Sequence, residues 1–257
     1  MSALKVKLAG ISVISLALAG CGGGDNNATF CGYDAYGDPI YCQITQPLPP
    51  LPIPVASTAS FNITQALVNI ATQNYSFNVS SADSYGNVYS ILYSSTAGQP
   101  GQFQTVGADS AIIKQVLSGN GGVIQTINST AYFTLSPYQF LGSETQIPGG
   151  SEVVNAWQTP PVVGTVGQTF PSFTATLYHD LSNTVIDGAV SETLGLSPDT
   201  ASTALLCLID STQLTQSGIN DGLNGGTTSN CFRIDSNGNV LGIQISTQIY
   251  GNQMLFY

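Results

Sequence analysis

The sequence predicts a mainly β domain, either an antiparallel curved sheet or a sandwich, with one short N-terminal helix. Runs rich in β-branched and aromatic residues alternate with short clusters of Gly, Asn, Asp and Ser, which is typical of strands joined by hairpin turns. Apolar and polar residues alternate along Gly242-Ile243-Gln244-Ile245-Ser246, as in an antiparallel strand with one face in water. One segment near residue 60 has helical spacing instead.

The helix is expected over residues 61–72, where the composition becomes that of a globular domain. Ser60 precedes this segment and is a candidate N-cap. The apolar residues recur three and four positions apart, so they form one face that can pack against a sheet. They are Ile63, Ala66, Leu67, Ile70 and Ala71.

Three predicted hairpins follow the helix, each with two strands around a turn-forming cluster. The paired segments are 76–81 with 88–95, 111–117 with 123–128, and 231–234 with 240–249. Single strands are expected at 131–135, 172–178, 190–194, 203–209 and 253–257. The first and third turns, Asp83-Ser84-Tyr85-Gly86-Asn87 and Asp235-Ser236-Asn237-Gly238-Asn239, are similar because turn chemistry recurs, and a true internal repeat is the alternative.

The N-terminal segment carries Lys5 and Lys7, then twelve mostly apolar residues, and then Leu18-Ala19-Gly20-Cys21. The apolar run is shorter than the ~20 residues that a membrane-spanning helix needs. The segment resembles the signal peptide and lipobox of a bacterial lipoprotein precursor, which implies cleavage before Cys21 and attachment of a lipid to its sulfur. By resemblance to proteobacterial lipoproteins, Gly22 after this cysteine implies sorting to the outer membrane. An ordinary secretory signal with an incidental cysteine is the alternative.

The chain is therefore expected to have three parts. Residues 1–20 are the signal peptide, residues 21–54 a lipidated stalk, and residues 55–257 the antiparallel β-domain. The stalk contains a loop between Cys31 and Cys42 and a proline-rich run at 47–54. That run predicts an extended polyproline II spacer that holds the domain away from the membrane.

Four cysteines remain once Cys21 is lipidated, and export places them where disulfides form. Three connectivities are possible. We favour Cys31–Cys42 and Cys207–Cys231, because the proline-rich run separates the first two cysteines from the others. A metal site is the alternative interpretation, but the spacings contain no CxxC pair and the chain has one His, so no metal site is expected.

Charged residues are only 7% of the chain, far below the ~25% of a typical protein. After cleavage two basic residues, Lys114 and Arg233, remain against fourteen acidic ones, a formal net charge of −12. Two cations cannot form a basic patch, which excludes electrostatic binding of nucleic acid. The same scarcity argues against docking on anionic lipid headgroups, so the membrane partner must be reached through the lipid anchor.

Possible catalytic groups are few. His179 beside Asp180 is where a catalytic triad could begin, but a G-x-S-x-G nucleophile motif does not occur, and Gly150-Ser151-Glu152 is expected to be a turn. A glycosidase needs two carboxyl groups facing across a cleft. Glu144, Glu152 and Glu192 are candidates, although spacing alone cannot show that any two converge.

Two possible binding features have simpler explanations. Asp235, Asn237 and Asn239 alternate like the start of a Ca²⁺ loop, but Ser246 stands where an EF-hand needs Glu, so a hairpin turn is expected. Aromatic residues could form a glycan platform, although packing within the sheet explains most of them, and the strand period places Tyr89 and Tyr93 on one face. The aromatic residues are Tyr75, Tyr85, Tyr89, Tyr93, Tyr132, Tyr138, Trp157 and Tyr178.

The order of segments within the mature domain supports the same class of protein. The stretches ITQALVNIATQ, YSFNVSSAD, VVGTVGQTF, LYHD and TALLCLID resemble a loose group of uncharacterised proteobacterial lipoproteins with β-rich domains. This resemblance covers most of residues 60–257. It implies no known activity and no functional residues.

These observations favour a lipid-anchored protein of the outer membrane, facing the periplasm or the cell exterior, with a non-catalytic structural or binding role. No enzymatic activity and no cofactor are expected. One alternative is a periplasmic carrier of lipid or another hydrophobic ligand, which an apolar cavity between sheet and helix would favour. Another is a secreted hydrolase with an unrecognised site, which convergent acids in a cleft would favour.

Overall fold

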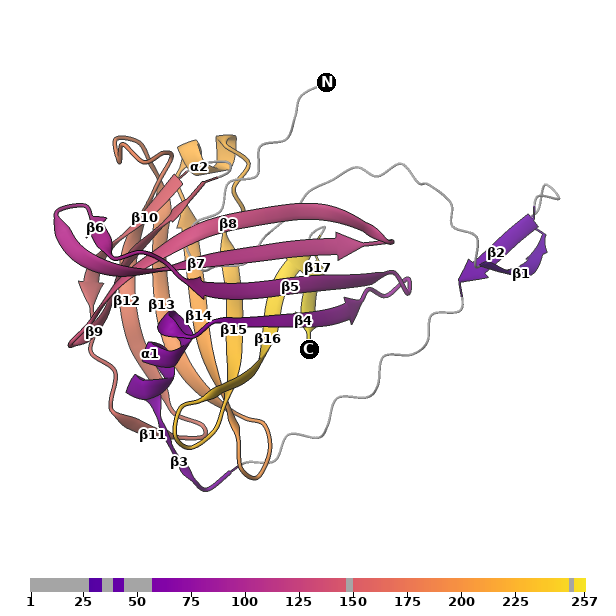
Figure 1. Ribbon diagram of the computed structural model, residues 1–257. Helices are drawn as coiled ribbons and strands as arrows, with labels where there is room; N and C mark the ends of the chain where they lie inside the picture. Colours follow the sequence, from indigo (N-terminus) through magenta and orange to yellow (C-terminus); the bar gives the residue numbers. More distant parts are fainter. Residues whose placement is uncertain (1–27, 34–38, 44–56, 147–149, 250–251) are drawn as a thin grey trace.

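The computed structural model describes residues 28–33, 39–43, 57–146, 150–249 and 252–257 (Figure 1). The predicted fold class is confirmed: the domain is mainly β and antiparallel. Thirteen strands form one sheet that curves until it nearly closes on itself. A single curved sheet, and not a sandwich, is therefore the form that the chain adopts.

The strand order across the sheet is β17-β16-β15-β14-β13-β12-β10-β9-β8-β7-β5-β4, with β6 paired to β7. The first and last strands of this order meet, because Ser80 and Tyr257 exchange two backbone hydrogen bonds of 3.2 Å. The bounds are β4 (Tyr75–Ala82), β5 (Val88–Ala97), β6 (Gly101–Phe103), β7 (Val106–Gly119), β8 (Gly122–Leu135), β9 (Tyr138–Thr145), β10 (Gly150–Trp157), β12 (Thr169–Tyr178), β13 (Ile186–Pro198), β14 (Ala204–Leu214), β15 (Gly226–Ile234), β16 (Val240–Ile249) and β17 (Asn252–Phe256).

All three predicted hairpins form. The strands expected at 123–128 and 131–135 are one continuous strand, β8. The turn expected at Gly150-Ser151-Glu152 is wrong, because these residues begin β10 and pair with β9, and two of them also pair with β12. Pro148 and Gly149, which favour turns, come directly before this segment in the sequence. The sequence pattern therefore predicted a turn at 150–152 and did not indicate strands β9 and β10.

Helix α1 (Ile63–Thr72) lies within the curve of the sheet, where it contacts strands from both sides of the fold (Figure 1). Its N-cap is Asn62, whose side chain accepts a hydrogen bond of 2.9 Å from the Gln65 amide. Ser60 is not the cap, because it belongs to β3 (Ser60–Asn62), which pairs with β11 (Val163–Thr165). Among the described residues, no helix has the length and apolar character needed to cross a membrane.

A second, shorter helix, α2 (Gln216–Asn220), was not expected from the sequence. It lies in the connection between β14 and β15 and packs against β13. Thr215 caps its N-terminus by accepting a hydrogen bond from the Gly218 amide. Five residues are too few to show helical periodicity, so only the tertiary contacts identify this turn.

Within the expected stalk, the described backbone forms a two-stranded antiparallel sheet of β1 (Ala28–Tyr33) and β2 (Pro39–Gln43). In its register Thr29 lies opposite Cys42. The side chains of Cys31 and Cys42 are outside the described part, so their disulfide stays a prediction. Cys21, the signal segment and the proline-rich run also lie outside it.

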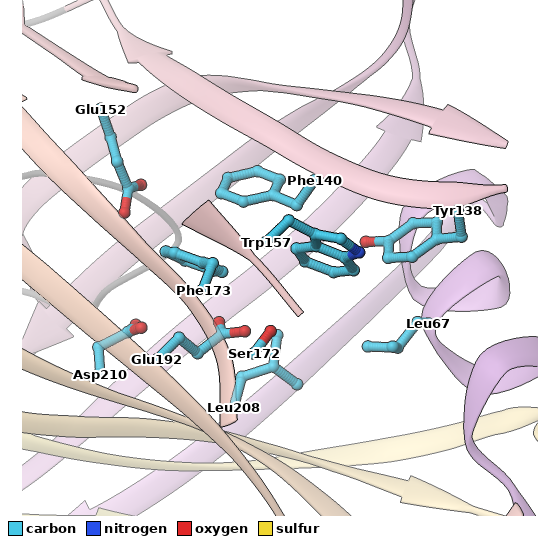
Figure 2. Close-up of a pocket in the computed structure, with 10 residues that line it drawn as sticks. All are labelled: Leu67, Tyr138, Phe140, Glu152, Trp157, Ser172, Phe173, Glu192, Leu208 and Asp210. Atoms are coloured by element: carbon cyan, nitrogen blue, oxygen red, sulfur yellow. The ribbon is translucent and has the colours of Figure 1, made fainter. Parts of the chain in front are cut away.

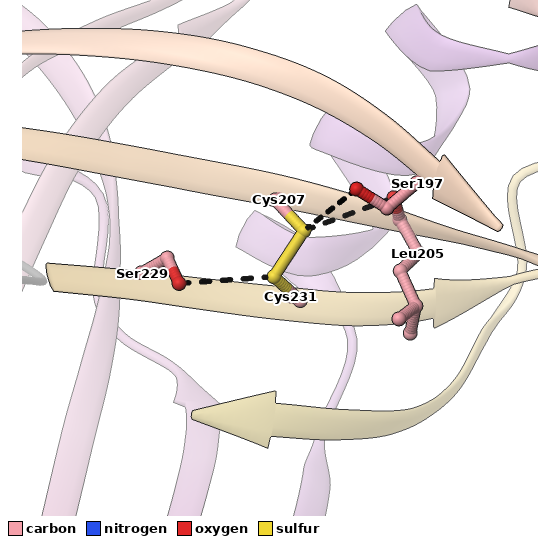
Figure 3. The surroundings of a disulfide bond; sticks show 5 residues. All are labelled: Ser197, Leu205, Cys207, Ser229 and Cys231. Carbon is pink, nitrogen blue, oxygen red and sulfur yellow. Dashed lines mark hydrogen bonds between the residues drawn. A yellow bond between two sulfur atoms is a disulfide. The ribbon is translucent and has the colours of Figure 1, made fainter. Parts of the chain in front are cut away.

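The predicted Cys207–Cys231 disulfide is present and joins two neighbouring strands (Figure 3). The two cysteines are direct partners in the register of β14 and β15, with Cα atoms 3.8 Å apart. Leu206 and Leu208 belong to the core, so alternation places Cys207 on the opposite, outer face of the sheet. The bridge therefore joins the strands from outside, without occupying the core.

The two similar turns have the same hydrogen bonds. In the second, one oxygen of Asp235 accepts from the Asn237 and Asn239 amides, and the other accepts from the Asn239 side chain. In the first, Asp83 receives the equivalent bonds from Tyr85 and Asn87. Burial alone would raise the pKa of Asp235, but these hydrogen bonds hold it below its usual value. The Asp235–Asn239 segment thus forms the hairpin turn that the sequence predicted.

The second turn also fastens α1 to the sheet. Asn69, which is 7% exposed, donates a 2.8 Å hydrogen bond to the Gly238 carbonyl, and the Asn62 amide donates to the Ser236 carbonyl. Gly238 has φ of +85°, and a Cβ there would lie 2.7 Å from the Ala66 nitrogen. Glycine is required at this position both for its backbone conformation and for the close approach of the helix.

Replacing Gly238 by Ala should lower the free energy of unfolding by ~3 kcal/mol, since the positive φ and the backbone clash both act against the folded state. Gly86→Ala is the matched control, because Gly86 has φ of +84° at the equivalent position of the first turn. It should cost only the ~1–2 kcal/mol of the backbone conformation. Urea unfolding of both variants measures the difference, and equal losses would contradict the helix contact.

Candidate functional site

A small cavity between α1 and the sheet brings three carboxyl groups together inside the fold (Figure 2). Glu152, Glu192 and Asp210 line it and are 1%, 7% and 3% exposed. Figure 2 shows their carboxyl groups directed into the same space. Acidic side chains are rarely buried to this extent without a cation, so this cavity is the first candidate for a functional site.

Strand register explains how two of these acids meet. Trp157 lies opposite Phe173, Phe173 opposite Glu192, and Glu192 opposite Asp210, on the neighbouring strands β10, β12, β13 and β14. These four side chains therefore form one row across the inner face of the sheet. Glu152 lies further along β10 and reaches the cavity from the other side, opposite Ser143 and Leu177.

Aromatic rings form much of the remaining wall. Phe140 and Phe173 pack with ring centres 5.1 Å apart, and Tyr138 meets Trp157 edge to face at 5.8 Å. Leu67 of α1 and Leu208 of β14 complete the apolar part, and Ser172 lies beside the acids. The carboxyl groups are thus held in surroundings of low polarity, which disfavour their ionised form.

Burial, together with the nearby Asp210, raises the pKa of Glu152 to about 8, although the hydrogen bond from the Ser143 hydroxyl acts in the opposite direction. Burial also raises the pKa of Glu192 well above its usual value, with Asp210 and Glu152 as additional causes and Ser172 opposing them. Carboxyl groups that keep their protons at neutral pH can donate hydrogen bonds as well as accept them. The cavity therefore offers acidic protons in a water-poor site.

The cavity has a volume of about 20 Å³, which is enough for one water molecule. Pockets that hold drug-sized ligands are of roughly 300–1,000 Å³. The side chains and α1 fill the rest of this space. In the conformation described, the acids can act on a water or on each other, but a substrate of ordinary size does not fit between them.

The structure brings together two of the three glutamates considered as catalytic candidates. Glu144 is on the other face of β9, where it accepts a hydrogen bond of 2.9 Å from the Tyr132 hydroxyl. Asp210 was missed, although the sequence contains a signal for it: Leu206, Leu208 and Asp210 alternate within an expected strand. The same alternation places Glu192 on the face of Val190 and Leu194.

His179, considered together with Asp180 as a possible start of a catalytic triad, lies at the end of β12 and contacts other carboxylates. Asp180 accepts hydrogen bonds from the amide and hydroxyl of Ser182. The His179 Nδ1 atom instead lies 2.5 Å from a carboxylate oxygen of Asp221 and 3.6 Å from one of Asp187. Within the described residues these are the groups that converge closely enough to hold a metal ion. Sequence spacing missed this trio because 42 residues separate His179 from Asp221.

Most members of the suggested aromatic platform serve packing. Tyr89 and Tyr93 share the inner face of β5, as the strand period predicts, and are 6% and 0% exposed. Tyr75 stacks on Tyr93 and also contacts Phe232. Tyr85 is the exception, since it is 88% exposed at the tip of the β4–β5 hairpin. An aromatic platform across the sheet is therefore not present among these residues.

No protein-family model, curated protein or solved structure matches this chain. What the site can do is therefore inferred from its own geometry and chemistry.

The free energy of unfolding should fall as the pH rises from about 4.5 to about 8. The unfolded chain loses the Glu152 proton near the ordinary pKa of 4.5, whereas the folded chain keeps it to about 8, so the unfolded state binds fewer protons in this window. Each such carboxyl contributes a slope of up to ~1.4 kcal/mol per pH unit. Glu152→Gln should reduce this slope and stabilise the protein at pH 8 but hardly at pH 4.

Glu144→Gln is the control, because it removes a carboxyl group from the outer face of the adjacent strand. Its unfolding free energy should keep the slope of the parent protein. Denaturant unfolding at a series of pH values measures all three proteins. A parent stability that is flat or rises over this window, or an unchanged slope in Glu152→Gln, would show that folding does not raise the pKa of Glu152 as described.

Proposed function

We propose that this chain is a lipid-anchored protein of the outer membrane and that its β-domain has a binding role without catalysis. The basic and apolar N-terminal segment followed by Leu18-Ala19-Gly20-Cys21 supports the anchor, and Gly22 supports outer-membrane sorting. The observation that carries the binding role is a pair of adjacent hairpin tips with exposed apolar side chains.

The two tips are those of the β4–β5 and β7–β8 hairpins. Because β5 and β7 pair along their length, with Tyr89 opposite Gly119, the two turns lie side by side at one end of the sheet (Figure 1). Tyr85, Val88 and Val123 are 88%, 41% and 66% exposed there. Exposed apolar side chains that gather at one place on a surface are typical of protein-binding sites.

A shallow hollow of about 420 Å³ separates the tips. It is lined by side chains and backbone without formal charge, namely Val88, Tyr89, Ser90, Ser118, Gly119, Asn120 and Gly121. Interface centres are poor in charged residues and rich in aromatic ones. Asn120 and Gly121 have positive φ, as the two central residues of a tight two-residue hairpin turn require. The backbone of the β7–β8 tip therefore has a defined conformation that a partner could recognise.

The filled interior argues against the carrier of hydrophobic ligands. In a carrier, the space between helix and sheet holds the ligand, whereas here Leu67, Ile70 and the aromatic side chains occupy it. A cavity of about 20 Å³ with three acids on its wall suits neither the size nor the polarity of a lipid chain.

A hydrolase is the second candidate, and the convergent acids are the observation that favours it. Glu152, with its pKa raised to about 8 by burial and by Asp210, has the protonation state of a general acid at neutral pH. Such a function requires α1 or the surrounding strands to move and admit a substrate. The enclosed cavity is the reason that we place this function second.

The anchor is tested by Cys21→Ser in the full chain. Removal of the acylated sulfur should release the exported protein from the membrane fraction, because acyl chains provide the membrane affinity and two basic residues in the mature chain cannot replace it. Fractionation after a high-salt wash measures this. A Cys21→Ser protein that still sediments with the membranes would overturn the proposed anchor.

The hairpin tips are tested by a photo-crosslinking amino acid at position 123 of the lipidated chain in cells. A discrete crosslinked species is expected, and Tyr85→Ala should weaken the contact by ~10-fold, since an exposed tyrosine at an interface centre contributes at least ~1.4 kcal/mol. Position 241 is the control, because Leu241 is 50% exposed just beyond the 235–239 turn. The same species from both positions, or none from position 123, would contradict binding at the tips.

A further inference from the structure

A second cluster of side chains, apart from the acid-lined cavity, lies where α2 packs against the start of β13. His179 follows β12, Asp187 is the second residue of β13, and Asp221 is the C-cap of α2. One ring nitrogen and one oxygen from each carboxylate lie within 4.8 Å of one another. The sole histidine of the chain thus faces two carboxylates that come from different elements.

The buried member, Asp187, is held in place by α2. Its side chain is 2% exposed, and its Oδ1 accepts a 2.9 Å hydrogen bond from the Ser217 hydroxyl. Its Oδ2 points into the cluster, where the His179 Nδ1 is 3.6 Å away, beyond hydrogen-bond distance. This buried oxygen is therefore oriented by a neighbouring hydroxyl, as metal-ligating carboxylates are.

The backbone makes this junction rigid. The Thr215 amide donates to the Asp187 carbonyl at 2.9 Å, and the Thr215 hydroxyl donates to the Ile186 carbonyl. A Cβ on Gly218 would lie 2.2 Å from the Asp187 carbonyl oxygen, so the first turn of α2 packs directly on β13. Thr215, Ser217 and Gly218 together fix the position from which Asp221 is presented.

Within the described residues, no lysine or arginine balances the charge of the two carboxylates in this cluster. With a neutral imidazole, the two carboxylates give a local charge of −2. The two basic residues of the described chain lie elsewhere, since Arg233 pairs with Asp199 at 2.7 and 2.9 Å and Lys114 is exposed on β7. A divalent cation would neutralise this charge.

We propose that His179, Asp187 and Asp221 bind a first-row divalent transition-metal ion such as Zn²⁺. The ligand atoms are Nδ1 of His179 and one oxygen of each carboxylate. Mixed imidazole and carboxylate ligands suit these metals, with bonds of ~2.0–2.2 Å. The side chains of His179 and Asp221 are 35% and 26% exposed, so they can separate slightly around the ion, and the fourth position is open to water. Sequence spacing predicted no metal site. The proposed site differs from that prediction because its three ligands come from separate elements of the fold.

Nδ1 binds a metal ion through its lone pair, so the bound imidazole carries its proton on Nε2. The ion would then lie between Nδ1 and the two carboxylate oxygens and replace the present contact of Nδ1 with Asp221. Without metal, the same groups would form only a contact between His179 and its carboxylates. These two possibilities differ in their response to zinc.

The test is isothermal titration of the full mature chain with Zn²⁺, and separately with Mn²⁺, at pH 7.5. Saturable binding of one Zn²⁺ per chain is expected, with an increase in melting temperature. His179→Asn and Asp221→Asn should each weaken binding by ~10-fold or more and remove the thermal shift. Asp180→Asn is the matched control, because Asp180 adjoins His179 but interacts with Ser182, and it should bind as the parent does.

Asp221→Asn keeps the proposal testable if His179→Asn does not fold, since Asp221 is partly exposed on the C-cap of the short helix. Weak, unsaturable zinc binding that is equal in all four proteins would mean only adventitious association with surface acids and would overturn the proposal. A parent protein whose melting temperature does not respond to zinc, while His179→Asn still lowers it, would mean that the contact between His179 and its carboxylates stabilises the fold without metal and would overturn the proposal too.

Discussion

The structure depends on the filling of the space that a nearly closed sheet encloses. Curvature directs the inner side chains of the strands toward one interior, and α1 packs into it with Leu67 and Ile70. The helix is held there by Asn69, which donates to the Gly238 carbonyl of the β15–β16 turn. Closure by the Ser80 and Tyr257 backbone then joins the two ends of the sheet around this helix. Without α1 the inner face would have no partner to exclude water.

The same enclosure explains the acids. Glu192 and Asp210 occupy inner-face positions of β13 and β14 next to Leu194 and Leu208, and Glu152 of β10 reaches the same cavity. Ionised carboxylates at such positions would be expensive, so the raised pKa of Glu152 and of Glu192 is the means by which the fold tolerates them.

The two regions proposed to bind a partner or a metal ion lie at the ends of the strands, away from that interior. The hairpin tips present Tyr85 and Val123 on long strands that β5 and β7 hold in register, and the α2 junction presents His179 beside Asp187 and Asp221. Both regions depend on the sheet that carries them, because functional groups on loops keep a fixed position only when a rigid scaffold supports the loops. The Cys207–Cys231 bridge joins the strands from which the α2 connection leaves and returns, and so supports the second region.

Local sequence patterns predicted most strands of the domain, its first helix and the Cys207–Cys231 bridge. Turn clusters located the hairpins, helical spacing located α1, and neighbouring cysteines paired as expected. The alternation of apolar and polar residues also indicates the face of the sheet on which Glu192 and Asp210 lie, but it does not determine the register in which the strands pair. The row formed by Trp157, Phe173, Glu192 and Asp210 depends on the pairing of four strands. The approach of Glu152 to this row and the contact of His179 with Asp221 likewise depend on the folded arrangement of the chain. These contacts join residues far apart in the chain, and they exist because the sheet curves and pairs in one register, a property of the whole fold that no local pattern contains.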